Sequence, residues 1–224
     1  MSYYIGLSFL SNNEESRRRG AEHTALRAEA RRILSAFEGR PIGENDMARD
    51  AQGRPFFPGR EVDFNISHSG NMAAVSYVSV ENPRLPQRTG CDIELIRPRT
   101  RMREIAEEFF SAPERNYVFS QDKFIEKKFY EIWTLKECFL KLYGLSVFDM
   151  AACPCFINEK TEFAFGAAVS CPLSFYLFEL SGSSERYILA TALEGTEPQQ
   201  PERRWFSQSP LACKMLHAIC ATVL

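Results

Sequence analysis

Long apolar runs, a basic leader and metal-spaced cysteines are all missing from this 224-residue chain. No apolar stretch reaches the roughly 20 residues that a membrane-spanning helix needs. Residues 1–10 carry no basic residue ahead of a hydrophobic segment, so we expect a first strand there and no signal peptide. The seven cysteines follow neither a zinc-site spacing nor a secreted disulfide framework. An odd number of thiols fits a reducing compartment, and we expect a cytoplasmic protein.

An excess of charge of one sign is also missing. The net charge is −2 at pH 7, which points neither to nucleic acid nor to a membrane surface. Lysine is absent from residues 1–103, where 16 arginines against 13 acidic residues leave a charge of +3. That surplus suits a phosphate-rich ligand, although it also suits an ordinary solvated helix surface. We expect a monomer that binds neither nucleic acid nor membrane.

Helical and strand periods alternate along the chain and predict the α+β class. Alternating apolar residues predict strands, and three- and four-residue spacing predicts two long helices, with a short apolar helix at the C-terminus. The strands are expected at 3–10, 62–67, 72–80, 90–96 and between 156 and 193. The helices are expected at 21–37, 101–110, 121–143 and 211–224, and residues 111–114 carry a further helix-start signal. We divide the chain into an N-terminal half (1–100), a C-terminal half (101–195), and a tail with a helix (196–224).

The helix around residues 129–143 has an unusual second face. Trp133, Glu137 and Lys141 stand four residues apart and therefore share one stripe, with Lys136 at its edge. A carboxylate between two ammonium groups can bind a metal ion and a phosphate together. Taken alone, the same residues also fit an exposed Glu–Lys pair, worth only a few tenths of a kcal/mol.

Two upstream segments favour the functional interpretation. In the strand 90–95, Asp92 and Glu94 share one face, and with Glu137 they form the oxygen-rich set that Mg²⁺ requires. The strand from Val62 runs into a Ser-His-Ser-Gly turn around His68, where backbone N–H groups can meet a phosphate.

In this order, the segments resemble the signature of the 4′-phosphopantetheinyl transferases of the surfactin-synthetase type. The quoted motifs are Phe64-Asn-Ile-Ser-His-Ser-Gly70, Gly90-Cys-Asp-Ile-Glu94 and Trp133-Thr-Leu-Lys-Glu-Cys-Phe-Leu-Lys141, supported by Gly53-Arg-Pro55 and Phe109-Phe-Ser111. The resemblance covers roughly residues 50–148, and several motifs in this order are more specific than any one of them.

The resemblance implies a pseudo-dimer of two similar α+β halves, each a small sheet packed on a long helix, with coenzyme A (CoA) in the cleft between them. It implies Mg²⁺-dependent transfer of the 4′-phosphopantetheine arm of CoA to a serine of an apo acyl or peptidyl carrier protein, releasing 3′,5′-ADP. A Mg²⁺-dependent nucleotide pyrophosphate hydrolase and a non-catalytic CoA- or carrier-binding module remain as alternatives.

The resemblance also assigns roles to residues. Glu137 is the expected general base, with His68 and Asp92 as weaker candidates, and Lys141 stabilises phosphate charge. The expected catalytic residues are Glu137, Lys141 and His68, the expected metal ligands are Asp92, Glu94 and Glu137, and the expected CoA-binding residues are Gly53, Arg54, Pro55, Asn65, Ser67, His68, Lys136 and Lys141.

Residue 24 and the segment 145–150 bear on how CoA and the carrier protein would be recognised. Thr24 stands where the family has an arginine for the 3′-phosphate of CoA, with Arg19 and Arg27 close by as replacements. The segment 145–150 contains Val147, Phe148 and Met150, and it follows the central helix where the family begins its carrier-binding surface. These apolar side chains suit either a carrier surface or the core.

Overall fold

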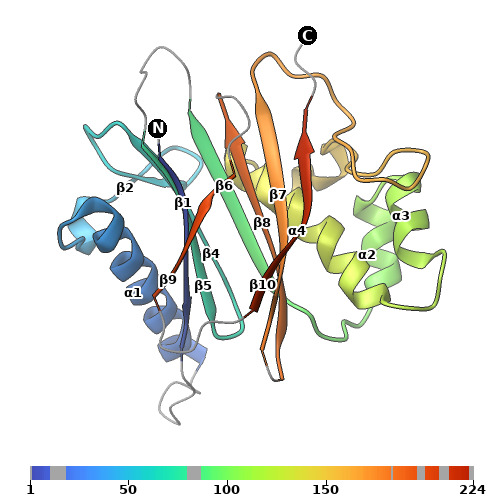
Figure 1. Cartoon of the computed structure of the whole chain (residues 1–224), viewed down its shortest axis with the longest axis horizontal. Coiled ribbons are helices and arrows are strands. Elements are labelled where there is room, and N and C mark those ends of the chain that lie inside the picture. Colours follow the sequence, from blue (N-terminus) through green and yellow to red (C-terminus); the bar gives the residue numbers. More distant parts are fainter. Residues whose placement is uncertain are drawn as a thin grey trace.

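The computed structural model describes residues 2–10, 19–79, 87–182, 184–195, 200–206 and 212–221, without the side chains of 19–23. Two four-stranded sheets lie between a single helix on one side and three helices on the other (Figure 1). The elements are β1 Tyr3–Phe9, α1 Arg19–Glu38, η2 Glu44–Asp46, β2 Ala48–Arg49, β3 Pro55–Phe56, β4 Val62–Ser69, β5 Met72–Ser79, β6 Arg88–Leu95, α2 Met102–Phe109, α3 Ala112–Phe119, α4 Ile125–Tyr143, η3 Val147–Ala152, β7 Leu173–Ser181, β8 Arg186–Glu194, β9 Glu202–Trp205 and β10 Ala212–Cys220.

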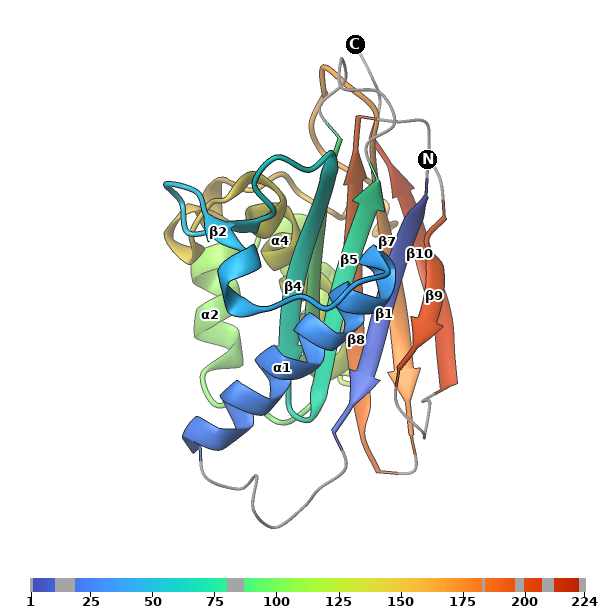
Figure 2. The same cartoon turned by 90° about the vertical axis from the view of Figure 1, so that its left-hand side faces the viewer.

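The first sheet has the order β4-β5-β1-β9, and α1 lies across its outer face (Figure 2). Antiparallel pairing joins β4 to β5 and β5 to β1, whereas β9 runs parallel to β1. Apolar residues of α1, including Ile33 and Leu34, pack against Phe64 and Val75 of the sheet. The predicted first helix and its strands are therefore one packed unit.

The second sheet has the order β10-β7-β8-β6, all antiparallel, and α4 packs on its outer face. Ile132, Leu135 and Leu142 of α4 are fully buried in the cluster that joins the helix to this sheet. A separate apolar cluster, which includes Ile5 of β1 and Leu189 of β8, lies between the two sheets. The predicted α+β class is confirmed.

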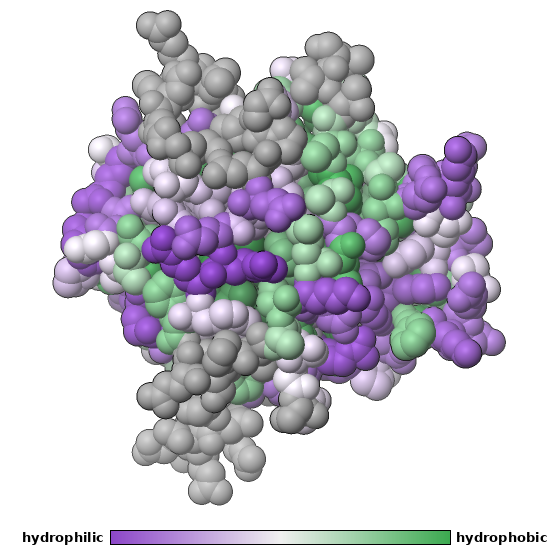
Figure 3. Space-filling model, viewed as in Figure 1, coloured by the Kyte–Doolittle hydropathy of each residue, from purple (hydrophilic) through white to green (hydrophobic). Residues whose placement is uncertain are grey.

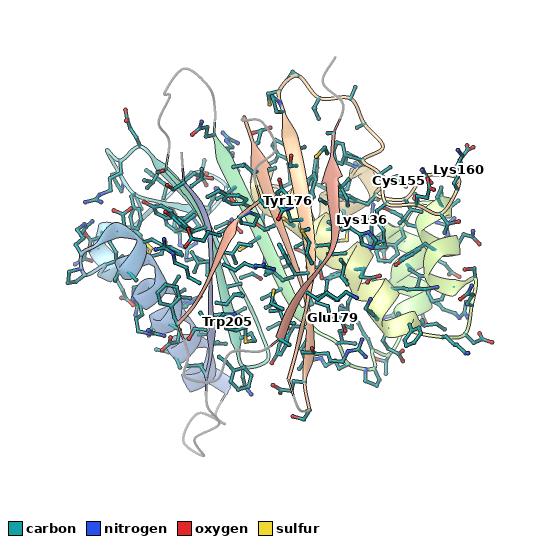
Figure 4. The ribbon with its side chains drawn as sticks, viewed as in Figure 1. Lys136, Cys155, Lys160, Tyr176, Glu179 and Trp205 are labelled. Atoms are coloured by element: carbon teal, nitrogen blue, oxygen red, sulfur yellow. The ribbon has the colours of Figure 1, made fainter. Side chains whose placement is uncertain are left out.

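The structure corrects the conformation predicted for the C-terminal segment. Residues 211–224 were expected to be helical, but Ala212–Cys220 form strand β10, which pairs with β7. The segment has no clear helical or strand period, so backbone hydrogen bonds to the open edge of β7 decide its conformation. Within the same predicted tail, Glu202–Trp205 form β9 and return to β1, where Trp205 is seen beside the first sheet (Figure 4).

Sheet membership also differs from the expected division of the chain. Strand β6 falls in the range 1–100, but its backbone pairs with β8 of the second sheet and not with the backbone of a strand of the first. The alternation of side chains along a strand shows which residues share a face, but it does not show which strand lies next to it in the sheet. The division at residue 100 and the internal duplication of the halves remain predictions.

The outer surface has the mixed character of an ordinary globular protein. Hydrophilic residues dominate the part that covers α2 and α3 (Figure 3). Within the described residues, no helix combines the length and apolar character needed to cross a bilayer.

Helix α4 approaches β6 closely at one residue. A Cβ added to Gly90 would lie 2.7 Å from the carbonyl oxygen of Cys138 and 3.0 Å from Cβ of Leu142. Real Cβ atoms do not tolerate such contacts with a backbone atom, so only glycine lets the helix lie this close to the strand. This contact fixes the spacing between the acidic strand and the central helix.

Candidate active site

The two sheets meet at their edge strands β4 and β6 through side chains. Four β4 side chains accept hydrogen bonds from backbone N–H groups at alternate residues of β6. The pairs are Asp63 with Thr89 (2.7 Å), Asn65 with Cys91 (3.2 Å), Ser67 with Ile93 (3.2 Å) and Ser69 with Leu95 (3.1 Å). We call this contact the β4–β6 seam. It satisfies N–H groups that would otherwise be exposed at the edge of a sheet.

Asp92 is the buried anion of the seam. Ser67 Oγ donates to its Oδ1 at 2.8 Å, and Lys141 Nζ lies 2.5 Å from the same oxygen. Lys141 Nζ also donates to Ser67 Oγ at 2.9 Å, which closes a three-membered network between β4, β6 and α4. The other oxygen of Asp92, Oδ2, is buried and has no hydrogen-bond partner among the described residues.

The three expected metal ligands influence one another's charge. Burial, and then the negative charge of Asp92, raises the pKa of Glu94. Burial raises the pKa of Glu137 to about 7, with Asp92 and Glu94 adding to the shift and Lys141 opposing it. For Lys141, burial lowers the pKa, but the neighbouring Asp92 outweighs it and the net pKa is raised. The Lys141 ammonium, with a smaller contribution from the Arg99 guanidinium to Glu94 and Glu137, therefore offsets the charge of three carboxylates.

This donor set fits a hard divalent cation. The orphaned Asp92 Oδ2 and the raised pKa of Glu137 both indicate negative charge that the described side chains leave incompletely compensated. As they stand, no three His, Cys, Asp or Glu side chains among the described residues converge closely enough to enclose a metal ion. A cation would therefore have to draw the carboxylates together.

His68 faces away from the seam, into a cavity beneath α1. The cavity has a volume of about 400 Å³, and three arginines line it together with His68 and Pro55. Those arginines are Arg27, Arg31 and Arg49. Alternation along β4 explains the division, because odd-numbered residues face β6 whereas Ile66 and His68 face α1.

Asn65 and Ser67, expected at the CoA phosphates, belong instead to the seam. Both are buried and engaged with β6. Gly53 occupies a turn with φ of +85°, a conformation that favours glycine, and its N–H donates to the carbonyl of Asp50.

Arg54 is also engaged within the protein. Its guanidinium bonds the Asp63 carboxylate and three backbone carbonyls, those of Phe64, Thr89 and Lys141. The side chain lines a separate cavity of about 300 Å³, next to Tyr143 rather than His68. Arg54 thus links the β4–β6 seam to the C-terminal end of α4 through hydrogen bonds. It does not line the arginine-lined cavity.

Lys136 is not brought to the site either. It is 1% exposed and pairs at 3.2 Å with Glu114, which is fully buried (Figure 4). Glu114 also accepts from the backbone N–H groups of Ser111 and Phe156, so the pair ties α3 to α4. Lys136 is next to Glu137 in sequence, but a helix turns about 100° per residue and directs the two side chains apart.

At the position of the missing arginine, Thr24 is exposed, and Arg27, one turn later, lines the cavity with His68. The side chain of Arg19 lies outside the described part. Sequence reasoning missed Arg31, Arg49 and Ser69. Only Ser69 left a signal, since it continues the polar alternation of Asp63, Asn65 and Ser67.

Comparison with known proteins finds a family for the central part of the chain. The profile of the 4′-phosphopantetheinyl transferase superfamily matches residues 88–192. These residues belong to the 4′-phosphopantetheinyl transferase superfamily.

Curated relatives agree with this assignment. The chain is 33% identical over 137 residues to the 4′-phosphopantetheinyl transferase HetI of Nostoc sp. PCC 7120, covering 58% of this chain and 53% of that protein. It is 35% identical over 127 residues to AcpT of Salmonella typhi, covering 55% and 61%, and 38% identical over 104 residues to AcpT of Escherichia coli K12, covering 45% and 50%. The chain thus spans about half the length of the curated relatives it matches.

The range matched by the superfamily profile contains the carboxylates and the lysine of the site, but not its β4 residues. Asp92, Glu94, Glu137 and Lys141 lie inside residues 88–192, whereas the serines of β4 and the arginine-lined cavity lie outside them. The resemblance found in the sequence is confirmed at the level of the superfamily, and the surfactin-synthetase type stays a prediction.

Proposed function

We propose that this protein transfers the 4′-phosphopantetheine arm of CoA to the serine hydroxyl of an apo acyl or peptidyl carrier protein, with Mg²⁺ and as a cytoplasmic monomer. The observation that carries the proposal is the set of three mutually interacting carboxylates around Lys141. A cavity lined by arginines lies on the other face of β4. All seven cysteines are free thiols, which supports the cytoplasmic setting.

The arginine-lined cavity suits the nucleotide end of CoA. CoA carries a pyrophosphate and a 3′-phosphate, and guanidinium groups have planar forks that match phosphate oxygens. Arg27 offers one at this cavity, and Arg31 and Arg49 could add theirs by leaving Glu44 and the carbonyl of Gly53. His68 lines the same cavity, where it can donate to a phosphate oxygen. Binding here would direct the pyrophosphate toward Lys141 and the carboxylates.

Asp92, Glu94 and Glu137 would hold Mg²⁺. When bound, the cation would neutralise charge on the pyrophosphate as the phosphorus–oxygen bond breaks. Lys141 remains protonated at neutral pH because its pKa is raised, so it can stabilise the same charge. Most of the catalysis would come from positioning and charge stabilisation.

Glu137 is suited to accept the proton of the carrier serine. Burial and Asp92 raise its pKa to about 7, and a general base is most effective when its pKa lies near the working pH, here taken as neutral. The serine oxygen bonds to the phosphorus that bears pantetheine, the bond to the bridging oxygen breaks, and 3′,5′-ADP leaves. The serine proton passes to Glu137, and the products are a phosphodiester on the carrier and the nucleotide.

Nucleotide release tests this function against pyrophosphate hydrolysis. We expect 3′,5′-ADP to appear from CoA and Mg²⁺ only when an apo carrier is added, and not when its acceptor serine is replaced by alanine. Release at the same rate without a carrier would identify a hydrolase, and no release with any carrier would leave a binding module.

Arg27 should recognise the 3′-phosphate of CoA in place of the missing arginine at residue 24. Arg27→Ala should weaken CoA binding about tenfold by calorimetry, the cost of one charge-assisted contact, with little effect on 3′-dephospho-CoA. Arg186→Ala, which removes an arginine paired with Glu179 in the other sheet, is the control and should affect neither ligand. Equal loss for both ligands would contradict this role.

The segment after α4 offers an apolar surface to the carrier. Leu145, Val147 and Phe148 are exposed, Phe148 to 89%, whereas Met150 is fully buried and belongs to the core. A carrier helix could place its apolar stripe on the three exposed residues. The exposure of Phe148 removes the possibility that it caps the core of the second half.

Phe148→Asp should therefore raise the KM for the carrier about tenfold and leave CoA affinity unchanged, as expected when a hydrophobic contact of about 1–2 kcal/mol is lost. Steady-state kinetics with the carrier varied would measure this. Phe124→Asp is the matched control, because Phe124 is also exposed but lies at the other end of α4. An unchanged KM in Phe148→Asp would exclude the segment from the carrier interface.

A further inference from the structure

Two serines of β4 make the same pair of hydrogen bonds to β6. Ser67 Oγ accepts from the N–H of Ile93 at 3.2 Å and donates to Asp92 at 2.8 Å. Ser69 Oγ accepts from the N–H of Leu95 at 3.1 Å and donates to Glu94 at 2.8 Å. Each serine therefore joins one backbone N–H to the carboxylate of the preceding residue.

The geometry of a hydroxyl explains why this pair of bonds fixes a carboxylate. A hydroxyl has one proton to donate and lone pairs with which to accept. Once its oxygen is held by a backbone N–H, the proton can point in few directions, and here it points at the neighbouring carboxylate. A serine side chain also has a single rotatable bond to the hydroxyl oxygen, so little freedom is lost in holding it.

The two serines differ in what else they touch. Ser67 also accepts from Lys141 and belongs to its charge network. The hydrogen bonds found for the Ser69 side chain are those to Glu94 and Leu95. Ser69 therefore offers a test of positioning that leaves Lys141 and Asp92 untouched.

Glu94 needs such an anchor. The carboxylate is half-buried on the same face of β6 as Asp92, and like charges on one strand face repel each other. Without a donor, this side chain would gain by rotating toward solvent and away from Asp92. The Ser69 hydroxyl opposes that rotation.

We propose that Ser69 is a positioning residue, which holds the Glu94 carboxylate beside Asp92 and so sets the affinity of the site for a divalent cation. This inference rests on the proposed function. Hydrogen bonds that orient metal ligands commonly change metal affinity by about 10–100-fold.

The test measures metal binding without turnover. Mg²⁺ is titrated into protein that holds CoA, with no carrier present, for wild type, Ser69→Ala and Ser69→Thr. Ser69→Ala should bind Mg²⁺ about tenfold more weakly, and Ser69→Thr, which keeps the hydroxyl, should bind like wild type. With a carrier added, Ser69→Ala should need correspondingly more Mg²⁺ for half-maximal rate.

Ser8→Ala is the matched control. Ser8 of β1 donates to Glu29 at 2.8 Å, an equally short serine–carboxylate bond away from the seam. Its loss should lower the Tm of the metal-free protein about as much as Ser69→Ala does, and leave Mg²⁺ affinity unchanged.

Either of two results would overturn the proposal: Ser69→Ala with wild-type Mg²⁺ affinity, or Ser69→Thr as weak as Ser69→Ala. These failures are separable from a failure of the proposed function. A wild-type protein that binds Mg²⁺ and CoA but modifies no carrier would overturn the function alone.

Discussion

Glu137→Gln should reduce carrier modification by about 10²–10⁴-fold, because a general base and an expected metal ligand are lost together. The amide has nearly the same shape as the carboxylate, so the fold should persist. Glutamine cannot accept the serine proton, and it supplies less negative charge for a cation. The rate at saturating CoA and carrier, measured by intact mass, gives the size of the loss.

The same substitution should stabilise the metal-free protein at high pH. Folding raises the pKa of Glu137 from 4.5 to about 7, so between these values the folded state binds more protons than the unfolded state. Stability therefore falls as pH rises through this window, and the full cost is present above pH 7. Glu137→Gln removes the cost, and its Tm should exceed that of wild type at pH 8 by a few degrees and match it near pH 4.

Glu126→Gln is the control for both effects, since Glu126 is exposed on the first turn of the same helix. It should change neither the rate nor the pH dependence of Tm appreciably. Near-normal turnover in Glu137→Gln would show that α4 does not carry the reaction, whatever its effect on stability.

Gly90→Ala should move the catalytic residues on α4 away from the carboxylates on β6. The new Cβ would lie 2.7 Å from the carbonyl oxygen of Cys138, so α4 must move away from β6. Overpacking of this kind costs about 1–3 kcal/mol. Because Asp92 and Glu94 lie on β6 whereas Glu137 and Lys141 lie on α4, the shift should also lower kcat by about 10²-fold, as small misplacements of catalytic groups do.

Gly43→Ala provides the matched comparison. A Cβ there would meet its nearest neighbour, Asp46 Oδ2, at 3.5 Å, which is ordinary contact, and φ of −93° suits alanine. Thermal unfolding and kcat should both stay near wild type in this variant. If Gly90→Ala behaved like Gly43→Ala, the close approach of α4 to β6 would not position the site.

Local sequence periods predicted the elements of the site well. Strand parity correctly placed Asp92 and Glu94 on one face, and four-residue spacing correctly placed Glu137 and Lys141 on one stripe. These relations follow from backbone geometry within one element. They needed no knowledge of the partner elements.

Relations between elements could not be predicted in this way. Lys136 is one residue from Glu137, yet its direction on α4 leads to a buried ion pair with Glu114. Arg54 belongs to the Gly53-Arg-Pro55 segment expected to bind CoA, but nearby carbonyls and Asp63 hold its guanidinium. Strand β10 exists because β7 has an open edge. In each case the tertiary neighbour decides, and it is remote in sequence.

The β4–β6 seam could be predicted only in part. The polar alternation of Asp63, Asn65, Ser67 and Ser69 was visible in the sequence. Its meaning required β6 to lie alongside, because side chains that accept from a neighbouring edge strand look like any solvated strand face. A polar strand face beside an acidic strand is therefore a signal worth testing.

The most direct measurement is the intact mass of apo carrier proteins from fatty-acid, polyketide and peptide synthesis after incubation with this protein, CoA and Mg²⁺. We expect at least one carrier to gain a single 4′-phosphopantetheine on its acceptor serine, only when CoA and Mg²⁺ are both present, and not with Glu137→Gln. A folded protein that binds CoA but leaves every carrier unchanged in mass would contradict the proposed function.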